Sequence, residues 1–83
     1  MADIDPATIT RWQASNRKDE QVAARLAAEL AGKQRWHQVD STFAIATRMD
    51  VSKTTAQRAK TLLATHGAIM QDPRNRTAGY FVQ

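Results

Sequence analysis

Apolar residues recur every three to four positions in two long stretches of the chain, which is the spacing of helices that bury one face. In the first stretch, Val22, Leu26 and Leu30 form a stripe that predicts a helix over residues 17–31. The second stretch predicts a helix over residues 53–66. Its expected buried side is apolar apart from one threonine, and consists of Thr55, Ala56, Ala59, Leu62 and Leu63.

Two shorter helices are predicted from residues that suit helix starts. Asp5 and Pro6 fit the N-cap and the first position of a short helix near the N-terminus. We expect Ser15–Asn16 to end that helix and to cap the one that follows. Residues 40–42, Asp-Ser-Thr, signal another helix that ends near Met49 and has Phe43, Ala46 and Met49 as its apolar residues.

The two C-terminal helices are separated by a tight turn at Asp50–Ser52. Aspartate tolerates the left-handed backbone conformation better than most residues, and we expect it at Asp50. Ser52 is then the N-cap of the last helix. Gly32 and Gly67 follow the two long helices and are expected to end them.

The C-terminal tail has the pattern of a β-hairpin. Residues 68–71 and 79–82 are predicted strands, and residues 72–78 form a loop rich in turn formers and arginine. Residues 35–39 are too short for a helix and are predicted to be extended. The expected fold class is therefore mainly α with a small β-hairpin.

The length of 83 residues allows one domain, which we place at residues 17–83, with residues 1–16 as an N-terminal extension. The chain has no cysteine, and His37 and His66 stand far apart, so neither a metal nor a cofactor is expected. No serine–histidine–acid constellation is recognisable, so the chain is not expected to be an enzyme. The aromatic residues are expected to be buried rather than to stack on single-stranded bases: Trp12, Trp36, Tyr80 and Phe81.

The positive charge is concentrated in the second half of the chain. Residues 1–40 hold six basic and six acidic side chains, whereas residues 41–83 hold six basic and two acidic ones. Such asymmetry favours a polyanionic partner, most simply nucleic acid. No apolar run approaches the roughly 18 residues of a membrane span, so we expect no membrane partner and a cytoplasmic location at the nucleoid.

Two helices joined by a tight turn and followed by a basic hairpin are typical of a winged helix-turn-helix, which offers its second helix to the major groove of DNA. On a helical wheel, the side of this helix opposite the apolar one has no acidic residue. It consists of Lys53, Thr54, Gln57, Lys60 and Thr61, with Arg58 on its flank. Lysine suits guanine, glutamine suits adenine, and a threonine methyl suits thymine.

Other residues are expected to hold phosphates without reading sequence. The helix starts at Ser41, Thr42 and Ser52 offer unpaired backbone N–H groups. Arg74 and Arg76 in the hairpin loop suit the minor groove or the phosphate backbone.

At these residues the chain resembles the DNA-binding domain of the GntR family of bacterial repressors. The resemblance covers about residues 17–82 and is most specific at Val51–Ala59, Val-Ser-Lys-Thr-Thr-Ala-Gln-Arg-Ala. Val39–Ala46 is similar to the family's Leu-Pro-Ser-Glu-Arg-Glu-Leu-Ala pattern, and Gln21–Leu26 and Gly79–Val82 are similar to its first helix and its wing strand.

The resemblance implies that the family's DNA-contacting positions are occupied here by Lys53, Thr54, Thr55 and Gln57. It also implies that the wing near Thr77–Gly79 approaches the minor groove. Phe43 stands where the family usually has a DNA-contacting arginine, Gln57 replaces a frequent arginine, and Asp50 replaces the turn glycine. The family's C-terminal effector domain has no counterpart in the sequence, so no small-molecule effector is expected.

The sequence therefore predicts a sequence-specific protein that binds double-stranded DNA, as a small transcriptional repressor of a bacterium or mobile element. It is expected to act as a homodimer or as several copies, because one helix reads only a few base pairs. One alternative is an architectural or accessory factor in plasmid replication, partition or recombination. Another is a protein–protein interaction module, which requires an exposed apolar patch. The N-terminal helix, with Ile9 and Trp12, is expected to pack on the core rather than to form a dimer contact.

Overall fold

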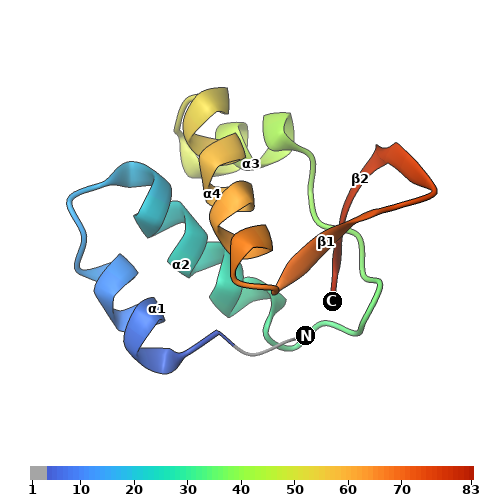
Figure 1. Ribbon diagram of the computed structural model, residues 1–83. Coiled ribbons are helices and arrows are strands. Elements are labelled where there is room, and N and C mark those ends of the chain that lie inside the picture. The colour runs from blue at the N-terminus through green and yellow to red at the C-terminus, as the bar shows by residue number, and fades with distance from the viewer. Residues whose placement is uncertain (1–3) are drawn as a thin grey trace.

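The computed structural model describes the backbone of residues 4–83, and all their side chains except those of residues 75–78. Four helices precede an antiparallel hairpin (Figure 1). The elements are α1 (Pro6–Gln13), α2 (Lys18–Leu30), α3 (Thr42–Met49), α4 (Lys53–Thr65), β1 (Ile69–Asp72) and β2 (Asn75–Val82). The mainly helical class with a small hairpin is thus confirmed.

Three of the four helix starts use the expected caps. The side chains of Asp5, Ser41 and Ser52 each accept a hydrogen bond from a backbone N–H in the first turn of α1, α3 and α4. The prediction for α2 is wrong, because its N-cap is Arg17, which makes no side-chain capping bond. Ser15 instead accepts from the N–H of Arg17, 3.0 Å away, and so supports the loop before the helix.

Left-handed residues end the last two helices. Gly67 has φ 77° after α4, and Asp50 has φ 54° at the end of α3, both as expected. Val51 then turns inward, and its N–H donates to the carbonyl of Ala46 at 3.0 Å. Gly32 also follows its helix, but it is not among the residues with positive φ, so its conformational freedom is not what ends α2.

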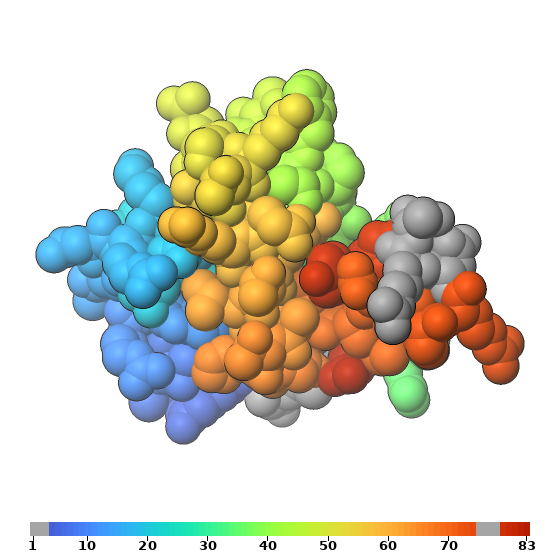
Figure 2. Space-filling view, turned by 45° about the horizontal axis from the view of Figure 1, so that its top comes forward, coloured from blue at the N-terminus to red at the C-terminus, as the bar shows by residue number. Residues whose placement is uncertain are grey.

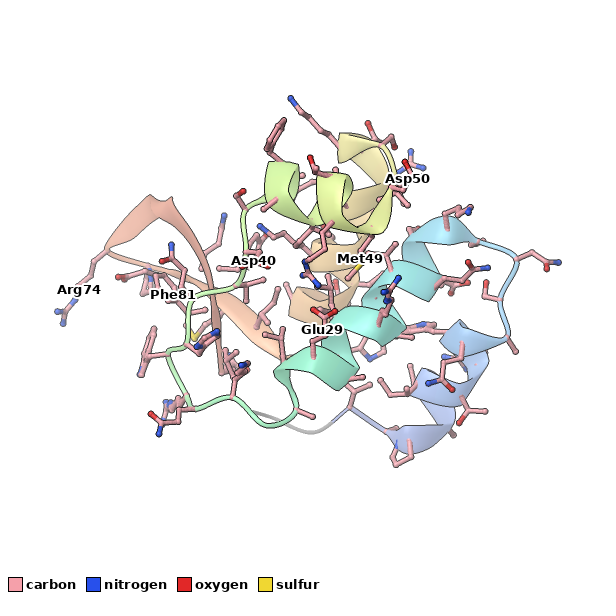
Figure 3. The ribbon with its side chains drawn as sticks, turned by 180° about the vertical axis from the view of Figure 1, so that it is seen from behind. Glu29, Asp40, Met49, Asp50, Arg74 and Phe81 are labelled. Atoms are coloured by element: carbon pink, nitrogen blue, oxygen red, sulfur yellow. The ribbon has the colours of Figure 1, made fainter. Side chains whose placement is uncertain are left out.

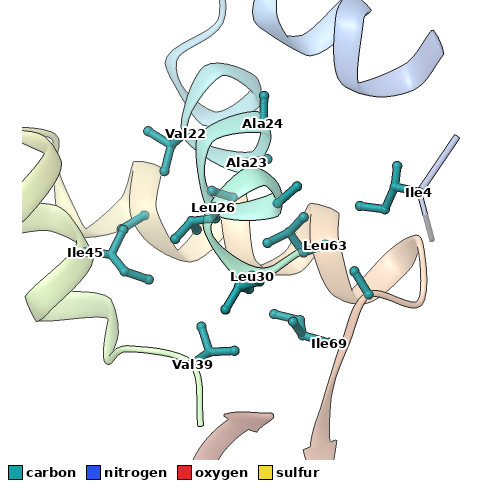
Figure 4. Packing of buried hydrophobic residues seen from close by; sticks show 14 of the residues in the cluster. Ile4, Val22, Ala23, Ala24, Leu26, Leu30, Val39, Ile45, Leu63 and Ile69 are labelled. Atoms are coloured by element: carbon teal, nitrogen blue, oxygen red, sulfur yellow. The ribbon is translucent and has the colours of Figure 1, made fainter. Parts of the chain in front are cut away.

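The core lies between α2 and α4, and the other elements close it (Figure 4). Leu26 of the first apolar stripe and Leu63 of the second are almost completely buried, which confirms both, and Ile45 of α3 is buried with them. α1 packs against α2 and lies at the end of the molecule away from the hairpin (Figure 1). Its Trp12 is only 2% exposed and meets the ring of His66 edge-on at 5.1 Å, so this helix belongs to the core as expected.

The hairpin is longer and less regular than predicted. β1 and β2 pair from Ile69 opposite Val82 to Gln71 opposite Tyr80. The register then shifts, and Asp72 pairs with Asn75. The predicted seven-residue loop is therefore wrong. The residues of β2 between Asn75 and Tyr80 are not paired with residues of β1. Gly79, with φ 88°, is one of them.

Residues 37–39 extend along the other edge of β2, as predicted, whereas the prediction is wrong for Arg35 and Trp36, which lie in a turn. Gln38 forms an antiparallel bridge with Phe81. The N–H of Val39 donates to the carbonyl of Tyr80 at 2.9 Å, and the N–H of Val82 donates to the carbonyl of His37 at 2.8 Å. These bonds attach the base of the hairpin to the chain that leads into α3.

Of the four aromatic residues expected to be buried, Trp12 is buried and Tyr80 and Phe81 are half-buried, but the expectation is wrong for Trp36, which is 50% exposed. Its backbone is left-handed, with φ 69°, and is held by a bond from its N–H to the carbonyl of Val82. The ring rests edge-on against the half-buried Phe81. None of the helices within residues 4–83 combines the length and the apolar character that a membrane crossing requires.

Candidate nucleic-acid interface

One side of α4 is open to solvent over its whole length. Five polar residues occupy it, and we call them the α4 polar face: Lys53, Thr54, Gln57, Arg58 and Thr61. All five are exposed, and the helix contains no carboxylate. Figure 2 shows the yellow-to-orange segment that contains α4 along the middle of one side of the molecule, without another element across it. The face therefore presents donors and two cations to an outside partner.

Lys60 does not belong to this face, which corrects the sequence prediction. It is only 4% exposed, and its Nζ atom lies 5.5 Å from the centre of the Tyr80 ring. The physical reason is that β2 and the segment before α3 cover this side of α4. Burial lowers the pKa of the Lys60 amine, and the carboxylate of Asp40 acts in the opposite direction.

Two hydrogen bonds restrain polar groups of the α4 polar face. The hydroxyl of Thr42, at the start of α3, donates to Oε1 of Gln57 at 2.9 Å. This assignment leaves the Gln57 NH2 group without a partner among the described residues. The hydroxyl of Thr61 donates to the backbone carbonyl of Gln57 at 3.0 Å, which fixes its rotamer.

The serine and threonine residues at the two helix starts have mainly internal roles. The Ser41 hydroxyl accepts from the N–H of Ala44 at 3.1 Å and leaves the N–H groups of Thr42 and Phe43 to an outside acceptor. Ser52 accepts from the N–H of Thr55 at 3.1 Å, and its own hydroxyl donates to the Thr55 hydroxyl. Thr55 is half-buried, so it supports the helix start and is not part of the exposed face.

The tip of the hairpin carries an exposed arginine. Arg74 points away from the rest of the molecule (Figure 3). Its backbone N–H donates to a carboxylate oxygen of Asp72 at 2.8 Å, which shapes the turn. The side chains of Arg76 and Thr77, which were predicted to contact DNA, lie outside the described residues. Gly79 contributes backbone only, and its positive φ suits glycine.

Arg48 is one of the six basic residues in the C-terminal half of the chain. It forms ion pairs on a side of the molecule away from the α4 polar face. Its guanidinium lies 2.7 Å from Glu29 of α2 and 3.1 Å from Asp40 (Figure 3). These bonds, above all the one to Glu29, raise the pKa of Arg48. Sequence reasoning missed these ion pairs because Glu29 and Asp40 stand 19 and 8 positions before Arg48, which matches no local spacing.

Beside the ion pairs of Arg48 is an open cavity of about 410 Å³, which Leu26, Lys33 and Val39 help to line. Its charged residues are of both signs, and the two carboxylates nearest to Arg48 are already paired with it. Within the described part of the chain, no three histidine, cysteine or acidic residues cluster in a way that suits a metal ion.

Sequence reasoning also missed the exposure of Phe43. Its ring lies next to Lys53 of the α4 polar face. Phe43 is 63% exposed, and the ammonium of Lys53 is 5.3 Å from the centre of its ring. The prediction that Phe43 is an apolar residue of α3 together with Ala46 and Met49 is wrong, because Ile45, Ala46 and Met49 supply the apolar side of this short helix. Phe43 lies outside that stripe.

No protein-family model matches the chain, and no significant match was found among curated proteins or among solved structures. A functional assignment consequently depends on the arrangement of the residues themselves.

Proposed function

We propose that the protein binds double-stranded DNA in a sequence-specific manner through a winged helix-turn-helix formed by α3, α4 and the hairpin. The observation that carries the proposal is the α4 polar face, an exposed helix side without a carboxylate. Since the major groove admits one α-helix, α4 enters it and presents Lys53, Thr54 and Gln57 to base edges.

The surroundings of α4 support this orientation. Arg58 and Arg74 are exposed and have no ion-pair partner among the described side chains, so both are available for phosphates. The start of α3 lies beside the second turn of α4, as the hydrogen bond from Thr42 to Gln57 shows. Lysine and arginine contacts to phosphate supply most of the affinity, and base contacts supply the preference.

The biological role that fits this binding mode is a small repressor in the cytoplasm of a bacterium, acting as a homodimer or as several copies on its site. A single winged helix reads few base pairs, so one copy gives limited affinity. The GntR resemblance of residues 17–82 supports the same role.

Selection of bound fragments from random duplex DNA is the first test, because it requires no knowledge of the site. The proposal expects an enriched motif, either a palindrome or a direct repeat. Enrichment of no motif, together with no binding in dilute buffer, would refute it.

Point variants on the selected site test the orientation. Lys53→Ala should cost about 1–3 kcal/mol and relax the preference at one position. Arg74→Ala should weaken binding to all sequences and reduce the salt slope by about one. Lys33→Ala is the matched control, because it removes the same charge as Lys53→Ala beside the cavity near Arg48. If Lys33→Ala has the same effect as Lys53→Ala, only net charge matters and α4 does not read bases.

A further inference from the structure

Phe43 has a surrounding that is unusual for an exposed aromatic ring. It lies at the start of α3, and Lys53 of the α4 polar face is next to its ring. Lys53 Nζ is 5.3 Å from the ring centre, and Thr42, the preceding residue, is bonded to Gln57. The structure therefore places one apolar group inside a surface that otherwise suits a polyanion.

A partner for this surface has to combine dense negative charge with an isolated apolar group. In duplex DNA that group is the C5-methyl of thymine, which lies in the major groove between the phosphate strands. Each other base pair edge in that groove presents only hydrogen-bond donors and acceptors. A phenyl ring has none to offer them, so it distinguishes thymine from the other bases by apolar contact.

We propose that Phe43 packs on the methyl group of a thymine and is a specificity-determining residue of the interface. The inference rests on the proposed function, because it requires α4 to lie in the major groove. Lys53 is held beside the ring and donates to an adjacent base edge, and the NH2 group of Gln57 points to the same groove. The α3 start then contributes to base reading along with α4.

Deoxyuridine substitution isolates the methyl group, since uracil keeps every hydrogen bond of thymine. In the site selected from random DNA, each thymine is replaced in turn, and the dissociation constant is measured by fluorescence anisotropy. For the wild-type protein, one position should lose about fourfold in affinity, the value expected for one apolar carbon removed from a contact. For Phe43→Ala, thymine and uracil at that position should bind equally.

Two further variants make the result specific. Phe43→Leu keeps an apolar side chain and should keep part of the uracil effect. Trp36→Ala removes another exposed large apolar ring, which lies against Phe81 on the hairpin, and should leave the effect unchanged. Circular dichroism checks that each variant is folded.

The failures of the two proposals are distinguishable. If the wild-type protein binds its site but tolerates uracil at every position, the Phe43 inference is overturned while DNA binding stands. If Phe43→Ala remains as sensitive as the wild type, another methyl group, such as that of Thr61, reads the thymine, and the inference is also overturned. If no duplex binds, both proposals fail.

Discussion

The turn between α3 and α4 contains a strain that one substitution should release. Asp50 has φ 54° and ψ 52° at the C-cap of α3. This left-handed conformation costs a residue with a Cβ atom about 1–2 kcal/mol, and aspartate lies at the lower end because it tolerates the conformation. The carboxylate also stands at the negative end of the α3 dipole, which costs about 0.3–1 kcal/mol.

Two variants separate these contributions. Asp50→Asn keeps a side chain that tolerates the left-handed conformation and removes the charge, so it should stabilise the protein by about 0.3–1 kcal/mol. Asp50→Gly also removes the Cβ atom, although the greater freedom of glycine in the unfolded chain offsets about 0.4–1 kcal/mol of that gain. We expect a net stabilisation of about 1 kcal/mol for Asp50→Gly, or about 4–8 °C in Tm for a domain of this size.

Urea unfolding at low salt and in 1 M NaCl measures both contributions. The dependence of the free energy of unfolding on urea should keep its slope, because the surface exposed on unfolding is unchanged. The gain of Asp50→Asn should shrink in high salt, whereas the backbone part of the gain of Asp50→Gly should not. Asp50→Ala is the control, since it removes the charge but keeps the Cβ atom without the short polar group. If Asp50→Gly is less stable than the wild type in both salts, the left-handed residue is not a source of strain and the reasoning is refuted.

Three other substitutions give direct tests of the fold. Trp12→Ala should destabilise by about 3–5 kcal/mol, a large part of the roughly 4–12 kcal/mol expected for a domain of this length, and an unchanged Tm would mean that α1 is not part of the core. Gly79→Ala should destabilise by about 1–2 kcal/mol, because φ is 88° there, and urea unfolding at a single pH is sufficient to detect this loss. Lys60→Met should be at least as stable as the wild type at pH 7, because burial lowers the pKa of the amine below its usual 10.5 and so disfavours the charged form in the folded state. Between the lowered pKa and 10.5 the unfolded state binds more protons than the folded state, so wild-type stability should rise with pH and the advantage of Lys60→Met should disappear. A Lys60→Met protein that is less stable than the wild type at pH 7 would contradict this and would show that the contact with the Tyr80 ring outweighs the desolvation.

Features that depend on a few neighbouring residues could be predicted from the sequence. The caps at Asp5, Ser41 and Ser52 form because a short polar side chain reaches an N–H two or three residues ahead. The left-handed conformation of Asp50 could also be predicted locally, because aspartate tolerates it and the residue stands in the turn between two predicted helices. The α4 polar face was predicted apart from its edge, because helical periodicity alone decides which residues share a side.

Features that depend on segments meeting in space could not be predicted. Lys60 lies at the edge of the polar arc on the wheel, and only the position of β2 decides that it is covered. Arg48 is removed from the exposed positive charge by partners on α2 and before α3. Trp36 is exposed because its backbone bond to Val82 holds it at the margin of the hairpin, away from the core.

The two-sided attachment of β2 has a consequence for the DNA that the proposed complex would select. β2 is bonded to β1 on one edge and to residues 37–39 on the other, so the base of the hairpin is held in a fixed direction relative to α4. A duplex that meets both α4 and the tip has to adapt the width of its grooves to that spacing. The elastic energy of this adaptation depends on which base-pair steps are bent or compressed. Base pairs between the two contacts would therefore influence affinity through their stiffness, although no side chain touches them.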